Sequence, residues 1–324
     1  MVNQIGEIAM GSSELLSKML SGDRLALARL ISHIESRPSD HLAILSKVQE
    51  RCQGVPVIGI TGPPGAGKST LVDQLITRLR QQKKKIGVVA IDPSSPFSGG
   101  AVLGDRIRMQ GHAGDESVFI RSLGSRGSRG GLSRATREVV KLYDAFGMDL
   151  VLVETVGVGQ TELDIMALAS TTIVMLTPES GDAIQTLKAG ILEIADIFVV
   201  NKSDREGADR ILSELKVMLE ISSKNGGWKV PVLPLQAVKG IGIEELIARI
   251  EDHREWSHRI GQKEREKITQ EEVAEIVMDE LRKRLTFSVL PGDNPYRKAE
   301  ELLKGVLWNK QRSARQGRTK ARKD

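Results

Sequence analysis

Apolar positions along the chain follow three successive patterns. Over residues 1–50 they recur at the three- and four-residue spacing of amphipathic helices, with a break at 21–23. From residue 55 onward, short apolar runs rich in β-branched residues alternate with helical segments. After about residue 263 the helical spacing returns in highly charged sequence. The pattern therefore predicts a helical segment, a central α/β domain and a second helical segment.

The apolar runs of the central domain predict strands that are buried on both faces. Runs without polar alternation are typical of parallel sheets covered by helices on both sides. We therefore expect an α/β fold with a mainly parallel sheet. The predicted strands are 55–61, 86–92, 118–122, 150–155, 172–177, 197–201 and 230–235. Two Gly- and Ser-rich stretches, 93–105 and 123–133, interrupt the domain, and loops of that length are usually functional.

Four regions follow from these patterns. We expect an N-terminal helical segment over 1–50, the α/β domain over 51–258, a C-terminal helical arm over 259–308, and a disordered basic tail over 309–324. Aromatic residues make up only 3% of the chain, so Ile, Leu and Val must build most of the core.

The basic charge of the chain is concentrated in the tail. Residues 309–324 hold seven Lys or Arg and one Asp, whereas the rest holds 40 Lys or Arg against 41 Asp or Glu. The tail has no aromatic residue to stack on bases, so we expect a solvated end rather than a nucleic-acid binder. No signal pattern and no stretch of about 18 uncharged apolar residues is present, which predicts a cytoplasmic protein without a membrane partner.

Residues 62–69 fit the phosphate-loop pattern G-x-x-x-x-G-K-[ST] at every fixed position. They follow the predicted strand 57–61 and open a predicted helix over 70–80, which is the context that the motif needs. In such a loop, backbone N–H groups and the helix N-terminus face phosphate oxygens. We expect Lys68 to reach the β- and γ-phosphates and Ser69 to supply an oxygen to Mg²⁺. The predicted nucleotide-binding residues here are Gly62, Pro63, Pro64, Gly65, Ala66, Gly67, Lys68, Ser69 and Thr70.

A second motif selects the base. Asn201 ends the predicted strand 197–201, and Lys202 and Asp204 follow it. Together they form the N-K-x-D arrangement of guanine-specific nucleotide triphosphatases. The Asp204 carboxylate can accept hydrogen bonds from guanine N1–H and the 2-amino group, whereas adenine would leave it unpaired. The motif lies at a strand end, where α/β sheets bind ligands. We therefore predict GTP rather than ATP.

Three acids are candidates for a magnesium site. Asp92 and Glu154 end apolar runs, and Asp105 follows the first Gly-rich stretch. An acid at the carboxyl edge of the sheet can bind Mg²⁺ directly or through water, so we expect these acids to join Ser69. The alternative for each acid is a helix cap or a surface charge. Gly157 can donate its N–H to a γ-phosphate, and loss of that phosphate would release its segment, as in GTPase switches.

The predicted catalytic residues are Lys68, Glu154 and Gly157, and this set is incomplete. Fast GTPases need a group that orients water and often a supplied arginine. Ras-like enzymes carry glutamine directly after the switch glycine, but this chain has Val158 there and Gln160 two positions later. We predict slow turnover that a partner accelerates.

The segment 181–188 has two readings. Asp182 followed by Gln185 fits a helix N-cap with a capping box, which is a purely structural arrangement. A signalling role is the alternative, and the residue pattern leaves both open.

Together these motifs resemble the MeaB/ArgK family of the SIMIBI class of P-loop GTPases. Its members are GTPase chaperones of adenosylcobalamin-dependent acyl-CoA mutases, chiefly methylmalonyl-CoA mutase. The resemblance implies that the GTP state gates cobalamin loading and protects the mutase from inactivation. It covers about residues 10–290 and is carried by Gly62–Thr70, Asp92–Pro96, Gly99–Gly100 with Leu103–Asp105, Glu154–Gln160 and Asn201–Asp204.

The resemblance also assigns roles that the residue pattern alone does not. It implies that the C-terminal arm mediates a homodimer, and that a third switch contains Asp182, Gln185 and Lys188. In related GTPases the turn after the last strand carries Ser-Ala and a backbone contact to the guanine oxygen. This chain has glutamine in place of that serine, and the predicted base-binding residues of the turn are Gln236, Ala237 and Val238.

Two other functions have sequence features that argue against them. A metal-insertion chaperone of the nickel-enzyme type would need clustered Cys and His ligands, but the chain has one cysteine, Cys52, and five scattered histidines. A small-molecule kinase that uses ATP would not need the guanine motif at 201–204.

Overall fold

The computed structural model describes residues 11–36, 38–92, 111–112, 114–124, 131–155, 157, 168–179, 194–222, 227–260 and short pieces of 270–301. The chain forms two compact units, Met1–Arg259 and Ile260–Asp324. In the second unit, helical turns cover 272–278 and 296–301. The region boundaries expected from the sequence remain predictions.

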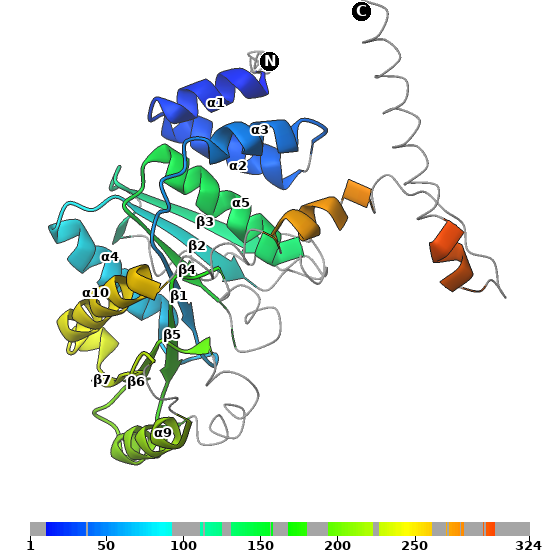
Figure 1. Cartoon of the computed structure of the whole chain (residues 1–324). Coiled ribbons are helices and arrows are strands. Elements are labelled where there is room, and N and C mark those ends of the chain that lie inside the picture. Colours follow the sequence, from blue (N-terminus) through cyan, green and yellow to red (C-terminus); the bar gives the residue numbers. More distant parts are fainter. Residues whose placement is uncertain are drawn as a thin grey trace, which may run out of the picture. The chain divides into compact units, whose positions relative to one another are not determined.

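Helices and strands alternate through most of the first unit, as Figure 1 shows. In chain order the elements are α1 (Ser12–Leu20), α2 (Arg24–Glu35), α3 (His41–Gln49), β1 (Val57–Thr61), α4 (Lys68–Gln81), β2 (Ile86–Asp92), β3 (Val118–Gly124), α5 (Gly131–Phe146), β4 (Leu150–Glu154), β5 (Thr171–Leu176), β6 (Ile197–Asn201), α9 (Ala208–Ser222), β7 (Val232–Leu235), the 3₁₀ turn η2 (Ala237–Lys239) and α10 (Ile243–Ile260).

The strands of the described residues form one seven-stranded sheet in the order β3-β2-β4-β1-β5-β6-β7. Every neighbouring pair is parallel, which confirms the expected α/β fold. Because parallel strands end at the same edge, the segments that follow β1, β4 and β6 meet there. This topology brings together motifs that lie more than a hundred residues apart in the sequence.

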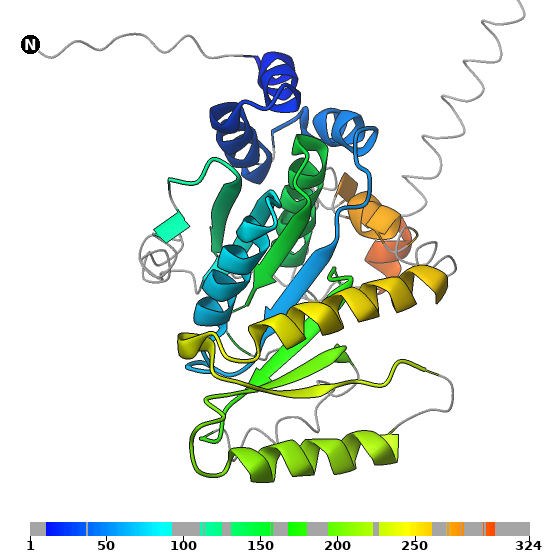
Figure 2. The same cartoon turned by 90° about the vertical axis from the view of Figure 1, so that its left-hand side faces the viewer.

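Successive side chains along each strand point to opposite faces of the sheet, and they build a separate core on each face. Ile58 and Ile60 of β1 face the core that α4 and α10 cover, whereas Val57 faces the core shared by α5 and the N-terminal helices. On β6, Phe198 and Val200 face α9. Figures 1 and 2 show the resulting layers, with α4 and α10 on one face and α5 on the other. Burial on both faces explains why the strands read as nearly continuous apolar runs.

One glycine sets how closely α5 approaches the sheet. A Cβ added to Gly87 of β2 would lie 2.3 Å from Cδ2 of Tyr143, which is too close for any other residue. The buried Tyr143 ring fills this space, and its hydroxyl donates to the Val88 carbonyl oxygen at 3.1 Å.

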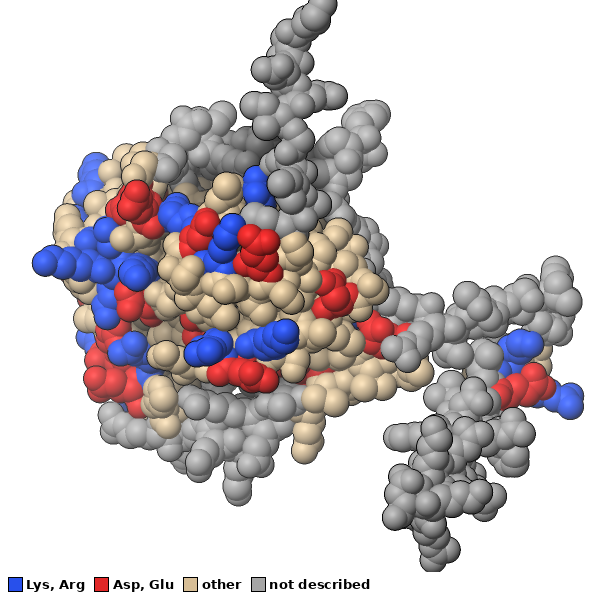
Figure 3. All heavy atoms as spheres, turned by 90° about the horizontal axis from the view of Figure 1, so that it is seen from above, with Lys and Arg blue, Asp and Glu red and all other residues tan. Residues whose placement is uncertain are grey.

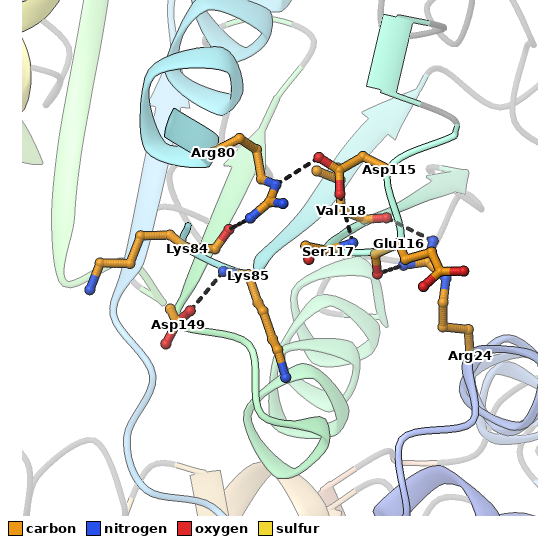
Figure 4. A network of polar contacts seen from close by, with 9 residues as sticks. All are labelled: Arg24, Arg80, Lys84, Lys85, Asp115, Glu116, Ser117, Val118 and Asp149. Atoms are coloured by element: carbon orange, nitrogen blue, oxygen red, sulfur yellow. Dashed lines mark hydrogen bonds and ion pairs between the residues drawn. The ribbon is translucent and has the colours of Figure 1, made fainter. Parts of the chain in front are cut away.

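Polar contacts fix the amino edge of the sheet (Figure 4). Arg80 of α4 donates from Nε to Asp115 Oδ2 at 2.7 Å and from Nη1 to the Lys84 carbonyl at 2.7 Å. Hydrogen bonding from Arg80 lowers the pKa of Asp115. Arg24 of α2 donates to the Val118 carbonyl at 2.8 Å, which ties the N-terminal helices to the start of β3. These contacts hold the segments that lead into β2 and β3.

One face of the described surface mixes charges of both signs (Figure 3). Seen from above, Lys and Arg lie interspersed with Asp and Glu rather than forming a patch of one sign (Figure 3). No helix among the described residues has the length and apolar character needed to span a membrane.

Candidate nucleotide-binding site

The phosphate loop follows β1 and depends on glycine at both of its ends. Gly62 has φ 148°, and a Cβ there would lie 2.2 Å from the Met175 carbonyl oxygen. Gly67 has φ 93°, and a Cβ there would lie 2.4 Å from Asn201 Nδ2. Both positions therefore require glycine for their backbone conformation and for close approach, of the Met175 carbonyl at Gly62 and of the Asn201 side chain at Gly67. The backbone that results bends from β1 directly into the first turn of α4.

Lys68 is the first residue of α4, and its side chain is buried. Its Nζ donates to the carbonyl oxygens of Gly62 at 2.8 Å and Pro63 at 3.0 Å. The ammonium group is therefore folded back over the loop, where it can meet the terminal phosphates of a nucleotide. The predicted contact of Lys68 with the β- and γ-phosphates remains a prediction.

Ser69 and Glu154 bring two oxygen donors together at the carboxyl edge. The Ser69 hydroxyl donates to Glu154 Oε1 at 2.6 Å, and both side chains are buried. Ser69 comes from the start of α4 and Glu154 from the end of β4, so the sheet topology creates this contact. A hydroxyl beside a carboxylate, next to a phosphate-binding loop, fits the oxygen donors that Mg²⁺ prefers.

Two threonines hold Gly157 beside the end of β1. The Thr61 hydroxyl donates to the Gly157 carbonyl at 2.7 Å, and the Thr155 hydroxyl donates to Thr61 Oγ1 at 2.9 Å. These contacts fix the start of the predicted switch segment against the strand that leads into the phosphate loop. Neither threonine is among the site residues predicted from the sequence, although Thr61 ends one apolar run and Thr155 directly follows another.

Asn201 joins the phosphate loop to the turn that is predicted to bind the base. Its Nδ2 donates to the Ala66 carbonyl at 2.8 Å, and its Oδ1 accepts from the Ala237 N–H at 3.0 Å. The side chain is buried, and both of its polar atoms have partners. One amide therefore sets the distance between the two halves of the site.

The base-binding end carries exposed ion pairs. Asp204 Oδ2 lies 3.1 Å from Lys239 Nζ, and the hydrogen bond from Lys239 lowers the pKa of Asp204. Lys202 has φ 56° and places its Nζ 3.5 Å from Glu179 Oε2, and Arg205 pairs with the same carboxylate. Burial acts to raise the pKa of Glu179, but hydrogen bonds from its backbone amide and Arg205 outweigh it and lower the pKa to about 2.

A cavity of about 590 Å³ connects the two ends. This volume is within the usual range for small-molecule sites. The predicted site residues that line it are Pro64, Gly65, Gly67, Lys68, Ser69, Thr70, Glu154, Asn201, Lys202, Asp204, Gln236, Ala237 and Val238. Gly62, Pro63 and Ala66 shape the same loop through their carbonyl oxygens.

Several predicted residues lie outside what the structure describes. Asp92 ends β2, but its side chain is not among the described ones. Asp105, Asp182, Gln185 and Lys188 also lie outside the described residues, so their proposed metal and switch roles remain predictions.

Two charged residues that were not predicted from the sequence also line the cavity. These are Lys239 and Arg205. Arg205 directly follows the guanine motif, so its place next to Asp204 in the sequence could have marked it as a candidate. Lys239 gives no such signal, because its contact with Asp204 depends on how two separate turns fold toward each other.

Comparisons with known proteins agree with this geometry. The profile of the family described as methylmalonyl-CoA mutase-associated GTPase MeaB matches residues 27–289. A Pyrococcus abyssi protein designated a GTPase is 44% identical over 312 residues, covering 91% of this chain and 96% of its own. The Escherichia coli GTPase ArgK is 36% identical over 243 residues, covering 72% of this chain and 73% of its own.

A solved structure shares the fold of the chain. The crystal structure described as LAO/AO transport system kinase has a TM-score of 0.67 and 26% identity, and it covers 95% of this chain and 99% of its own. The family match extends over most of the sequence and contains the whole of the pocket described above. The chain therefore belongs to the MeaB/ArgK family of methylmalonyl-CoA mutase-associated GTPases.

Proposed function

We propose that this GTPase gates cobalamin loading into an adenosylcobalamin-dependent acyl-CoA mutase, methylmalonyl-CoA mutase, and protects that enzyme from inactivation. The observation that carries the proposal is the family match over residues 27–289, whose name states the association with this mutase. The pocket supports it, because the phosphate loop and the guanine motif lie on one continuous cavity. Binding energy from a nucleotide can therefore act on both ends at once.

We assign the phosphate end to GTP hydrolysis. Lys68 would neutralise charge on the β- and γ-phosphates, as its position over the loop allows. Ser69 and Glu154 would hold Mg²⁺, with Asp92 and Asp105 as further candidates. When bound, the metal supplies positive charge to the phosphate oxygens. Gly157 would give its N–H to the γ-phosphate from the position that Thr61 fixes.

We assign the base end to guanine recognition. Asp204 would accept from guanine N1–H and the 2-amino group, and Asn201 would hold the turn of Gln236, Ala237 and Val238 against the base. Lys202 would pack its aliphatic stem beside the base, since it lines the same cavity.

The partner-facing part of the proposal rests on two regions. Asp182, Gln185 and Lys188 would form a switch that reports the nucleotide state to the mutase. The helical turn 272–278 exposes three apolar side chains, Val273, Val277 and Met278, which suits an arm that forms a homodimer. Analytical ultracentrifugation of the full chain tests the dimer directly.

Steady-state GTP hydrolysis tests the function. We would measure turnover of the purified chain alone and with the cobalamin-dependent acyl-CoA mutase of the same organism. We expect slow turnover alone, faster turnover with the mutase, and loss of both in Lys68→Ala. Turnover that no such mutase changes would contradict the proposed client and would favour a metal-insertion GTPase instead.

Cobalamin transfer tests the gating step separately. Loading of the mutase with adenosylcobalamin should depend on whether this chain holds GTP, GDP or a non-hydrolysable GTP analogue. Equal loading rates in all three states would contradict gating, even if the mutase accelerates hydrolysis.

A further inference from the structure

Lys239 lies at the base-binding end of the pocket and contacts the carboxylate that is expected to read guanine. Its Nζ is 3.1 Å from Asp204 Oδ2, and both residues line the cavity. Asp204 has a short side chain at the end of the guanine motif, so its two oxygens are the groups available to a base. The lysine occupies one of them.

Hydrogen bonds hold the backbone of the turn that carries Lys239, whereas the Lys239 side chain is exposed. Gln236 N–H donates to the Ile241 carbonyl at 3.1 Å, and Ile241 N–H donates back to Gln236 at 3.3 Å. Gly240, at φ 69°, closes the turn directly after Lys239. The Lys239 side chain is 58% exposed, so the ammonium group has access to solvent while the backbone of the turn keeps these hydrogen bonds.

Guanine and Lys239 share an acceptor at Asp204. Two adjacent donors of the base, N1–H and the 2-amino group, call on both carboxylate oxygens, so a base N–H and the ammonium group would draw on the same atom, Oδ2, and each would weaken the hydrogen bond of the other. We propose that Lys239 competes with guanine for Asp204 and thereby speeds nucleotide release. The inference rests on the proposed guanine-binding function and deepens it, because it names a residue that sets how long the nucleotide stays.

The expected effect is modest because the pair is partly exposed. An ion pair between exposed side chains in water contributes little, so its removal should change affinity by about two- to fivefold. Interface changes of this kind act mainly on dissociation, since a partner that competes for the carboxylate helps the bound group to leave. The same contact lowers the pKa of Asp204, because the ammonium group of Lys239 favours the ionised carboxyl.

Lys239→Met tests the competition, since methionine keeps an unbranched chain of similar length without the charge. We would measure dissociation of a fluorescent GDP analogue from the full chain by stopped-flow displacement. We expect release to slow by about two- to fivefold with little change in the association rate. Lys216→Met, on the exposed side of α9, is the matched control for the loss of one positive charge and should leave release unchanged.

A second background separates competition from general attraction between lysine and a nucleotide. In Asp204→Asn the carboxylate is gone, and the amide suits xanthine, whose C2 oxygen replaces the amino group. There, Lys239→Met should no longer slow release of a fluorescent xanthosine diphosphate. Unchanged or faster GDP release in Lys239→Met, or equal slowing in both backgrounds, would overturn the proposal. Failure of the unsubstituted chain to bind GDP would instead contradict the proposed function.

Discussion

The two ends of the nucleotide pocket differ in how they hold their charged groups. At the phosphate end, Lys68 and Glu154 are each 6% exposed and are fixed by short hydrogen bonds. At the base end, the Asp204 and Lys239 side chains are 44% and 58% exposed. Charges that are removed from water interact strongly, whereas water and salt screen exposed pairs. We therefore expect substitutions at the phosphate end to change activity strongly and substitutions at the base end to change it only modestly.

This difference follows from the positions of the groups in the fold. Lys68 and Ser69 begin a helix whose next turn is packed into the core, so their backbone cannot shift independently. Asp204 and Lys239 lie on two surface turns that are linked through Asn201. The phosphate end is therefore built by the core, and the base end is built by turns that a single buried amide aligns.

The largest expected effect is at Lys68. Lys68→Ala removes the buried cation that we propose to face the terminal phosphates, and removal of one such stabilising group typically lowers turnover by about 100-fold or more. GTP hydrolysis under single-turnover conditions measures the loss. Lys216→Ala provides a matched control on an exposed helix face. A fall of less than tenfold would mean that the phosphate end is not the rigid, buried catalytic end inferred here.

The next effect should appear in the magnesium requirement. Ser69→Ala removes the hydroxyl that contacts Glu154 Oε1 at 2.6 Å, so one of the proposed oxygen donors is lost. Loss of a metal-positioning group commonly weakens metal affinity by about 10- to 100-fold. Magnesium titrations of GTP hydrolysis should show this shift, and Glu154→Gln should show one as well. Unchanged magnesium dependence in both variants would contradict the proposed metal site.

Asn201 tests whether the two ends depend on one linker. Asn201→Ala leaves the Ala66 carbonyl and the Ala237 N–H without their partner, which should destabilise the fold by about 1–3 kcal/mol. GDP affinity should fall by about tenfold, because both ends lose their alignment. Urea unfolding and GDP titration measure the two quantities.

Asn201→Asp makes that test more specific. The carboxylate keeps an acceptor for the Ala237 N–H but loses the donor to the Ala66 carbonyl. A variant that binds GDP as tightly as the unsubstituted chain would show that the phosphate loop does not need this link, and the comparison between the two ends would then lack its connecting element.

Much of the pocket could be predicted from the sequence because its spacing is local. The fixed positions of 62–69 specify glycine, lysine and serine for reasons that operate within one loop, and the parallel topology then places 201–204 at the same edge. The strand pattern was equally informative, since burial on both faces leaves continuous apolar runs. Predicted strand limits were less accurate, as at β7, which begins at Val232 rather than at residue 230.

Contacts between separate turns could not be predicted in the same way. The pairs Asp204–Lys239 and Glu179–Arg205 join segments that are 35 and 26 residues apart, and no local spacing marks them. The roles of Thr61 and Thr155 also depend on two neighbouring strands ending level with each other. Such residues become visible only when the sheet order is known.

The smallest expected effect concerns the pH dependence of the base end. The folded-state pKa of Glu179 is about 2 against an ordinary value of 4.5, so the hydrogen bonds that its ionised carboxylate accepts from its backbone amide and from Arg205, with the charge of Lys202, stabilise the fold fully above pH 4.5. This contribution is lost as the pH falls from 4.5 through about 2, because protonation ends the pairing with Lys202 and Arg205. Glu179→Gln lacks the contribution at every pH. The difference in unfolding free energy between the two proteins should therefore shrink as the pH is lowered.

Urea unfolding at pH 6 and at pH 3.5 measures that change, and the step should be small because the pair is exposed. Glu206→Gln is the matched control, since Glu206 is an exposed acid in the turn between β6 and α9, beside Arg205, and has no ion pair within the described residues. Its difference from the unsubstituted chain should stay constant with pH. If Glu179→Gln behaves in the same way, then Glu179 does not hold the base-binding loop, and the base end depends on Asn201 alone for its alignment.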